Sequence, residues 1–579
     1  MKPAAPVVHP LARISVLVIV PLLIALGAST AAGAVNSSVA RPSNAKHQPA
    51  RPTAKAAAPR TPQTTTTTTT TTTRKPAAAL SKTPATAILL SHIAHTYTVR
   101  KLNDASNTAL CGINCTLRNA INKANATAGV DLITFAKIGT ITLNAAYGSL
   151  NPTTSMVIQG LGPAKTIVSG QGCTCGLFDI EYGTSRPTVE IDGMKITKGS
   201  GENGGGVYVG SAAVILDHDV ITDNKVGASY YGGGVYVGNT DSQFWLTAST
   251  VSANNALYGG GIWFNYGAAV LSNDTIGGTK AAQGNEAVGG YGGGIYNDDG
   301  VISAYNTHVD HNRSDTTSGA YGGGIYNCCY TLSMQGGSVS NNVVNAGTGS
   351  GYGGGLYLDS SGYSVQLDGV HVDGNRIVGT YGEGGGIYNS TYLQMTGSTA
   401  SGNAIILTAD NDSGYGAGIS DESQLQMIGG SINGNTIQRG GAATYINAYG
   451  AGFYEDDWAT FNAVTIKGNK ALAGASGYAY GGGGYGDYSD LFRNVVVSGN
   501  HANGYDAYGA GLYLDTGYEA HISHGTFSGN VNSATNYAEG AAIDQEGDDL
   551  ALSDVSIVGS TNTVSAGGVY AGAVYCYYE

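Results

Sequence analysis

The sequence predicts an all-β protein: a single-stranded, right-handed parallel β-helix of about 13 coils, with ~31 residues per coil and an N-terminal capping helix. Three observations carry this prediction. The 579 residues include 90 glycines, which is far too many for an ordinary helical or α/β domain. A glycine triplet followed by an apolar residue and a tyrosine recurs at a fixed period. An asparagine recurs at one place between successive triplets.

Residues 1–34 have the pattern of a cleaved signal peptide. Lys2 and Arg13 precede the apolar run at 14–28, and small residues follow it. A buried helix and an uncleaved anchor are the alternatives. Cleavage is favoured because the apolar run is shorter than the ~20 residues that a membrane span needs. The mature protein is therefore predicted to have no transmembrane span.

Residues 35–96 are rich in alanine, proline and threonine, with a run of threonines at 64–73. This composition predicts a disordered, extended stalk. All 40 acidic residues follow residue 103, whereas basic residues crowd the part before it. Because the body after the stalk is strongly acidic, it repels nucleic acid and anionic polysaccharides and attracts cations. We therefore expect no nucleic-acid partner.

Residues 97–203 are predicted to form the N-terminal cap and the first coils. The segment at 115–126 carries one apolar helical face, formed by Leu117, Ala120, Ile121 and Ala124. An amphipathic helix here covers the open end of a β-helix, whose free edge otherwise invites aggregation.

Residues 204–579 are predicted to form the glycine- and tyrosine-rich repeats. Each coil is expected to hold three short strands: the triplet strand, an alternating run such as 393–397, and a run ending in asparagine such as 398–403. A looser segment then leads to the next triplet. Helical repeats are excluded because each glycine costs a helix ~1 kcal/mol. The repeat markers, which are the third glycine or the residue in its place, are Gly206, Gly234, Gly261, Gly294, Gly324, Gly355, Gly386, Gly418, Gly452, Gly483, Gly511, Ala542 and Ala573.

The recurring asparagines are predicted to form a stacked, structural ladder at one corner of the coils. Asparagine side chains can hydrogen-bond their equivalents in the next coil and tolerate a left-handed turn. The predicted ladder contains Asn224, Asn254, Asn312, Asn342, Asn375, Asn403, Asn435, Asn469, Asn500 and Asn530.

Three segments resemble known families of exported β-helix proteins. The segment at 115–120 resembles the Cys-Ser-Leu-Arg-Glu-Ala segment that opens one such family, with Asn119 in place of the glutamate. Residues 292–295 and 527–530 resemble the Gly-Gly-Ala-Ile and Phe-x-x-Asn motifs of the polymorphic outer-membrane protein repeats, in the pectate-lyase-like superfamily. This resemblance implies surface display and, for some members, adhesion. The outer-membrane members also carry a C-terminal translocating barrel, whereas this sequence ends in repeat material, so we expect general secretion.

An aromatic column is the first candidate for binding. It lies two residues after each repeat marker, and two interpretations are open: mutual stacking that shields the glycine corner, or a face that binds sugars or a protein partner. The candidate binding residues are Tyr296, Tyr326, Tyr357, Tyr388, Tyr454, Tyr485 and Tyr513. A second set of tyrosines precedes the triplets.

An acidic column is the candidate metal site. It lies four residues after the marker, and in-register carboxylates ~4.8 Å apart repel one another unless they splay into solvent or Ca²⁺ bridges them. Both outcomes remain open. The column consists of Glu422, Asp456, Asp487, Asp515 and Glu546.

The sequence therefore predicts a secreted or cell-surface protein, an extracellular monomeric rod that binds carbohydrate or a host or neighbouring surface protein through repeated columns. A polysaccharide lyase or glycoside hydrolase is the first alternative, and a structural envelope protein the second. The segment at 216–219 resembles a lyase strand but occupies an ordinary strand position, so no catalytic residue is assigned. No cofactor is required, and Ca²⁺ is the ion that the acidic column would take. Six of the seven cysteines fall into close pairs, which suits local disulfides.

Overall fold

The computed structural model describes residues 80–81, 90–105, 111–181, 186–359, 363–441, 443–515, 520–547 and 549–577. Every described residue lies in the unit Arg74–Glu579. The predicted signal peptide and most of the predicted stalk lie outside the described residues. Within the described part of the chain, no helix is both long and apolar enough to cross a membrane.

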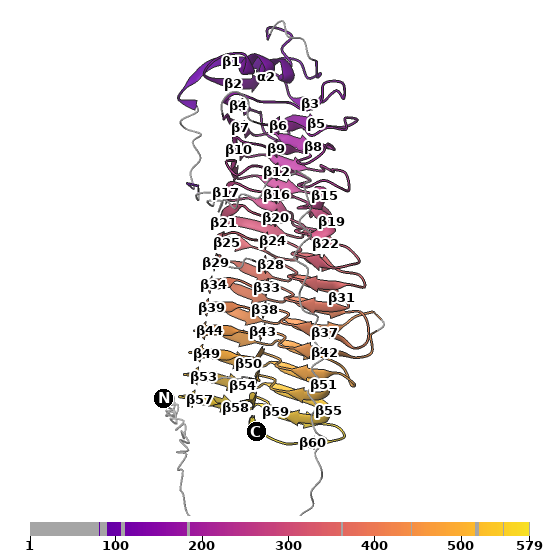
Figure 1. The fold of residues 1–579 in the computed structure, drawn as a ribbon, viewed down its shortest axis with the longest axis vertical. Coiled ribbons are helices and arrows are strands. Elements are labelled where there is room, and N and C mark those ends of the chain that lie inside the picture. Colours follow the sequence, from indigo (N-terminus) through magenta and orange to yellow (C-terminus); the bar gives the residue numbers. More distant parts are fainter. Residues whose placement is uncertain are drawn as a thin grey trace, which may run out of the picture. The chain divides into compact units, whose positions relative to one another are not determined.

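The described residues form a parallel β-solenoid, in which successive coils repeat one path (Figure 1). In one such coil, β33 (Ile387–Asn389) follows the glycine triplet, and β34 (Tyr392–Thr396) and β35 (Thr399–Ser401) come next. The chain then returns to the next triplet through β36 (Ala404–Leu407) and β37 (Asp412–Tyr415). The predicted fold class is confirmed.

Three long sheets run along the stack. The triplet strands form a 14-stranded sheet from β6 (Phe178–Ile180) to β61 (Val574–Tyr577). The strands equivalent to β34 and β35 belong to a 29-stranded sheet, and those equivalent to β36 and β37 to an 18-stranded sheet. Because the 14-stranded sheet takes one strand from each coil, the solenoid has about 14 coils of ~31 residues, one more than the markers predict.

The register confirms that residues one period apart lie over each other. Ile387 in β33 is in register with Leu356 in β28 (Leu356–Asp359) and with Ile419 in β38 (Ile419–Asp421). All three side chains are buried in the main hydrophobic core. A column of the sequence is therefore a physical column of the solenoid.

The segment after each asparagine is more ordered than the sequence predicts. A looser connection was expected here, but in most coils the segment forms two strands of the 18-stranded sheet. In β36, Ile405 and Leu407 alternate with half-buried residues and pack into a second core cluster. A single pair of alternating apolar residues is enough to build a strand when equivalent strands flank it on both sides.

The glycine triplets are required by close backbone contacts. Gly384, the first of its triplet, has φ +63°, a conformation that glycine adopts without strain. At Gly386, the third, a Cβ would lie 2.6 Å from the carbonyl oxygen of Gly418 and 2.7 Å from the side-chain amide of Asn403. Each triplet therefore turns the chain and lets the coils approach.

The predicted cap is a helix, α2 (Leu117–Asn125), which lies beside β1 (Ile93–Val99) and β2 (Val130–Phe135) at the N-terminal end of the stack (Figure 1). Thr116 caps its first turn by accepting a hydrogen bond from a backbone amide. All four residues of the predicted apolar face are buried: Leu117, Ala120, Ile121 and Ala124.

Arg118 fixes the cap helix to the first coil. Its guanidinium donates two hydrogen bonds, of 2.8 and 2.9 Å, to the two carboxylate oxygens of Asp104. It also donates to backbone carbonyls at 147–149. Both ionic side chains are buried. A buried ion pair is tolerated when further hydrogen bonds surround it, and the backbone carbonyls supply them to Arg118.

An outer apolar patch lies on the 29-stranded sheet near the cap. It consists of Val157, Ala213, Ile215, Trp245 and Val270. Leu80 packs against this patch, and Trp245 donates its indole N–H to the carbonyl of Ser81 over 3.0 Å. Trp245 is consequently only 8% exposed, although it lies on the outside of the coil.

The six paired cysteines form three local disulfides, Cys111–Cys115, Cys173–Cys175 and Cys328–Cys329. Cys576 is a free, exposed thiol. The predicted local pairing is confirmed, and the first bridge lies directly before the cap helix.

Candidate functional site

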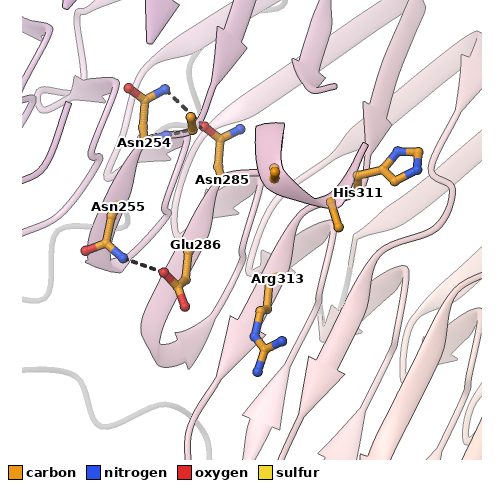
Figure 2. Close-up of a pocket in the computed structure, with 10 residues that line it drawn as sticks. Asn254, Asn255, Asn285, Glu286, His311 and Arg313 are labelled. Carbon is orange, nitrogen blue, oxygen red and sulfur yellow. Dashed lines mark hydrogen bonds between the residues drawn. The ribbon is translucent and has the colours of Figure 1, made fainter. Parts of the chain in front are cut away.

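A polar pocket lies beside the asparagine ladder, where a short 3₁₀ turn, η1 (Ala281–Gln283), is inserted into one coil (Figure 2). Its lining includes Glu286, His311 and Arg313. Figure 2 shows His311 pointing away from the other two. Arg313 is held by Asp315, with 2.8 Å between the charged groups. These side chains do not converge as an acid–base pair requires.

The asparagine ladder is confirmed and is closed by hydrogen bonds. Asn435, for example, accepts from the backbone and side-chain amides of Asn403 and donates to Asn469 and to the carbonyl of Ala400, all at 2.8–3.1 Å. The ladder also includes Asn285, which the sequence analysis missed. The η1 insertion separates this residue from a recognisable strand.

The predicted aromatic binding column is a stack. Tyr357 lies parallel to Tyr326 and Tyr388, with ring centroids 4.9 and 4.8 Å apart. The tyrosines that precede the triplets cover this column edge-on, as Tyr321 does against Tyr357. The seven candidate binding residues are only 2–5% exposed: Tyr296, Tyr326, Tyr357, Tyr388, Tyr454, Tyr485 and Tyr513. Stacking, the alternative interpretation, is confirmed, and ligand binding by this column stays a prediction.

Burial also keeps these phenols neutral. Desolvation, followed by the charge of Asp359, raises the pKa of Tyr326 well above its usual value. The same burial, with its stacked neighbour, raises the pKa of Tyr357. The column is therefore an uncharged aromatic seam at ordinary pH.

The acidic column is in register. The amide of Asp456 donates to the carbonyl of Asp421, and that of Asp487 to the carbonyl of Glu455, each over 3.0 Å. Equivalent bonds place Asp515 next in line. The five predicted side chains are all half-buried or exposed: Glu422, Asp456, Asp487, Asp515 and Glu546. Whether Ca²⁺ bridges the whole column stays a prediction.

In the described part of the chain, two groups of three potential ligands bring one atom each within 4.8 Å of the others. One is Asp192, Asp217 and His218, which includes the lyase-like segment. Its histidine is largely exposed, and the imidazole Nδ1 lies 2.8 Å from a carboxylate oxygen of Asp217, so it is a solvated surface group. The other is Glu539, Asp544 and Glu546.

An interior acid cluster lies inside the coils. Asp421 and Glu455 are in register on triplet strands, and Gly486 occupies the next place. Asp490 fills the space above this glycine, where a Cβ would lie 2.1 Å from its carboxylate. Asp421, Glu455 and Asp490 are all fully buried.

The oxygens of Glu455 and Asp490 have no well-formed hydrogen bond from any donor in the described structure. Burial raises the pKa of Asp490 to about 8, and nearby groups offset only part of that shift. Burial, then the charges of Asp490 and Asp421, raise the pKa of Glu455 well above its usual value. Burial therefore favours the protonated forms of Glu455 and Asp490.

The exposed aromatic face is the strongest candidate for binding. Tyr392 in β34 and Trp458 in β44 (Trp458–Asn462) are 37% and 44% exposed. Both are in register with Gln424 in β39 (Gln424–Ile428), one on each side of it. The two rings are thus two coils, ~10 Å, apart on the outside of the 29-stranded sheet.

Amides lie beside these rings. Gln394 donates to the side-chain oxygen of Gln426 over 3.1 Å, and the hydroxyl of Tyr392 reaches the same oxygen over 3.4 Å. The acidic column runs two residues before this face in sequence, with Glu422 before Gln424 and Asp456 before Trp458. The sequence analysis missed the face because no two consecutive coils carry an aromatic residue at this position, since Gln424 lies between the two rings. The only signal in the sequence was an aromatic residue at an outward-facing position of a strand whose residues alternate inward and outward.

Comparison with protein-family models, with characterised proteins and with solved structures finds no match for this chain. The resemblance to polymorphic outer-membrane repeats and pectate-lyase-like proteins therefore rests on short motifs alone. What the structure confirms is the parallel β-solenoid fold.

Proposed function

We propose that this chain is an exported adhesin whose solenoid binds a neutral glycan on the exposed aromatic face. The observation that carries the proposal is the pair Tyr392 and Trp458, two exposed rings on one flat sheet with Gln424 between them. Aromatic faces pack against the apolar faces of sugar rings, and amide side chains bond their hydroxyls. The ring spacing is about that of a disaccharide unit in an extended glycan.

The acidity of the body supports a neutral ligand. The net charge is −13, and the acidic column runs alongside the face. Its field repels an anionic polysaccharide at a distance, whereas a neutral glycan meets no such barrier. Carboxylates also accept hydrogen bonds from sugar hydroxyls.

The covered patch near the cap supports the proposal, because Leu80 packs on the outside of the same sheet there. Trp245 lies on the outside of the sheet and is bound by the segment that contains Ser81. Trp458 lies on the same sheet and is open. An outer tryptophan on this sheet can therefore bind a polar group through its indole N–H while an apolar group packs beside it.

Pull-down on a panel of insoluble neutral polysaccharides, with a glycan array, tests this function. Trp458→Ala is expected to lose binding by ~10-fold or more, as for a central anchor residue. Tyr392→Ala is expected to lose less, because the tyrosine is smaller and less exposed. Tyr505→Ala in β51 (His501–Tyr508) is the matched control, because Tyr505 is 38% exposed on a different sheet.

Two results would reject the proposal: wild-type protein that binds no member of the panel, or Trp458→Ala that binds as well as wild type. Cleavage of the signal and display on intact cells are tested separately, by N-terminal sequencing of the mature protein and by antibody labelling.

A further inference from the structure

Two aromatic columns are interrupted in the same coil. Glu539, the last residue of β55 (Val531–Glu539), is in register with Tyr508 and takes a place that tyrosine holds in most coils. Asp544 in β56 (Ile543–Glu546) is in register with Tyr513 on one side and Tyr575 on the other. A carboxyl thus replaces a stacked ring in both columns at once, near the C-terminal end of the stack (Figure 1).

Asp544 is fully buried, and neither of its carboxylate oxygens has a hydrogen-bond partner of good geometry. Its surroundings make a bare charge costly. Burial, then the charges of Glu539 and Glu546, raise the pKa of Asp544 well above its usual value, and the nearby Gly509 amide offsets only part of the shift. A buried carboxylate without a donor needs a proton or a cation.

The geometry favours a cation. Glu539, Asp544 and Glu546 each present one carboxylate oxygen, and the three oxygens lie within 4.8 Å of one another. An ion at their centre would lie within about 2.8 Å of each oxygen, close to the range of roughly 2.3–2.6 Å that Ca²⁺ prefers. Glu546 is half-buried and leaves the ion an approach from solvent.

We propose that Glu539, Asp544 and Glu546 form a Ca²⁺ site. Three hard, anionic oxygen ligands select Ca²⁺ over softer ions. The buried setting disfavours Mg²⁺, which gives up its water reluctantly. The site replaces ring stacking by ion ligation in one coil and so ties the two columns together there. It uses only the last member of the acidic column, with two ligands from the tyrosine columns.

Thermal unfolding of the full chain in Ca²⁺, in Mg²⁺ and in chelator tests the site. Ca²⁺ is expected to raise Tm by a few degrees, and Mg²⁺ at the same concentration by less. Asp544→Asn is expected to lose the Ca²⁺-dependent shift. Asp544→Tyr, which restores the stack between Tyr513 and Tyr575, is expected to lose the shift and to melt above wild type in chelator. Asp515→Asn, a change in the acidic column outside the three-ligand group, keeps the full shift.

Terbium luminescence supplies a measurement that does not depend on any variant. Tb³⁺ takes Ca²⁺ sites, and the ring of Tyr508 or Tyr513 beside this one sensitises its emission. We expect emission on excitation of tyrosine in wild type, with displacement by Ca²⁺. The proposal is overturned if Tm is the same in Ca²⁺ and chelator, if Asp544→Asn retains the shift, or if Tb³⁺ shows no sensitised emission. A stability that depends on pH but not on Ca²⁺ assigns protons alone to the group.

Discussion

The asparagine ladder and the interior acid cluster are both buried polar columns of one solenoid, yet they satisfy burial in different ways. An asparagine carries a donor and an acceptor, so each copy pairs with the next, as Asn403, Asn435 and Asn469 do. A carboxylate carries acceptors only. Glu455 and Asp490, which lie on neighbouring strands of different sheets, therefore meet as two acceptors, and burial favours their protonated forms. A buried polar side chain can repeat along a parallel stack with all its hydrogen bonds made only if it carries both a donor and an acceptor for its own copies.

The largest expected effect comes from breaking the ladder. Asn435→Ala removes four side-chain hydrogen bonds: two that Asn435 accepts from Asn403, and one each that it donates to the carbonyl of Ala400 and to the side-chain oxygen of Asn469. The backbone amide of Asn403 then has no partner in the ladder, whereas Asn469 still accepts from the backbone amide of residue 435. Each buried unpaired group costs ~1–3 kcal/mol, so we expect a loss of about 4 kcal/mol in unfolding free energy. Urea unfolding with hydrogen exchange across β40 (Ser431–Asn433) and β41 (Thr436–Arg439) measures it.

Thr436→Ala, at the half-buried position next to the ladder, is the control and should cost less than ~1 kcal/mol. Equal losses in the two variants would mean that the ladder contributes no more than an ordinary strand residue, and the comparison would fail.

The second effect has the opposite sign. Asp490→Asn gives the acid cluster a donor that can reach Glu455 and removes a carboxyl that is fully buried. We expect a gain of about 2 kcal/mol in unfolding free energy at pH 7.5, because an unpaired buried carboxyl no longer has to hold a proton. Chemical denaturation at that pH measures the gain, with Asp456→Asn as the exposed control. A destabilised Asp490→Asn protein would show that the cluster is satisfied by groups other than protons.

The smallest expected effect, counted per pH unit, is the pH dependence of the unfolding free energy, and it tests the role assigned to Asp490 a second time. Because the folded pKa of Asp490 is raised to about 8, the folded state holds its proton after the unfolded state has released it. The contribution of Asp490 to the unfolding free energy is therefore fully present below about pH 4. It falls as the pH rises toward 8, by at most ~1.4 kcal/mol per pH unit for one proton. Unfolding free energies across this range should show the fall in wild type and a flatter profile in Asp490→Asn. Identical slopes in both proteins would assign the dependence to other groups.

Much of the fold could be predicted because a parallel stack turns a sequence period into a spatial column. The triplets, ten members of the ladder and the register of the acidic column all follow from spacing alone. Asn285 was missed because the η1 insertion changes the local spacing, and the 18-stranded sheet because its strands carry little apolar sequence.

The candidate sites were harder to predict because they break the repeat. Tyr392 and Trp458 flank a glutamine, so no column marks them. Asp544 interrupts the tyrosine column in the sequence, but its role depends on Glu539, which lies in another sheet and is not placed beside it by the repeat spacing. Burial, which decides whether a tyrosine stacks or binds, depends on the second aromatic set lying over the first and cannot be obtained from spacing.

Because the coils share one register, the length of the solenoid can change without changing how neighbouring coils pair. Because Gly386 is followed by Ile387 just as Gly418 is followed by Ile419, excising the residues between two such points rejoins like to like. Recombination between repeats can then shorten or extend the solenoid one turn at a time while its ends stay intact. The coils that carry Trp458 and Asp544 differ from the rest, so losing or duplicating one of them would change more than the length.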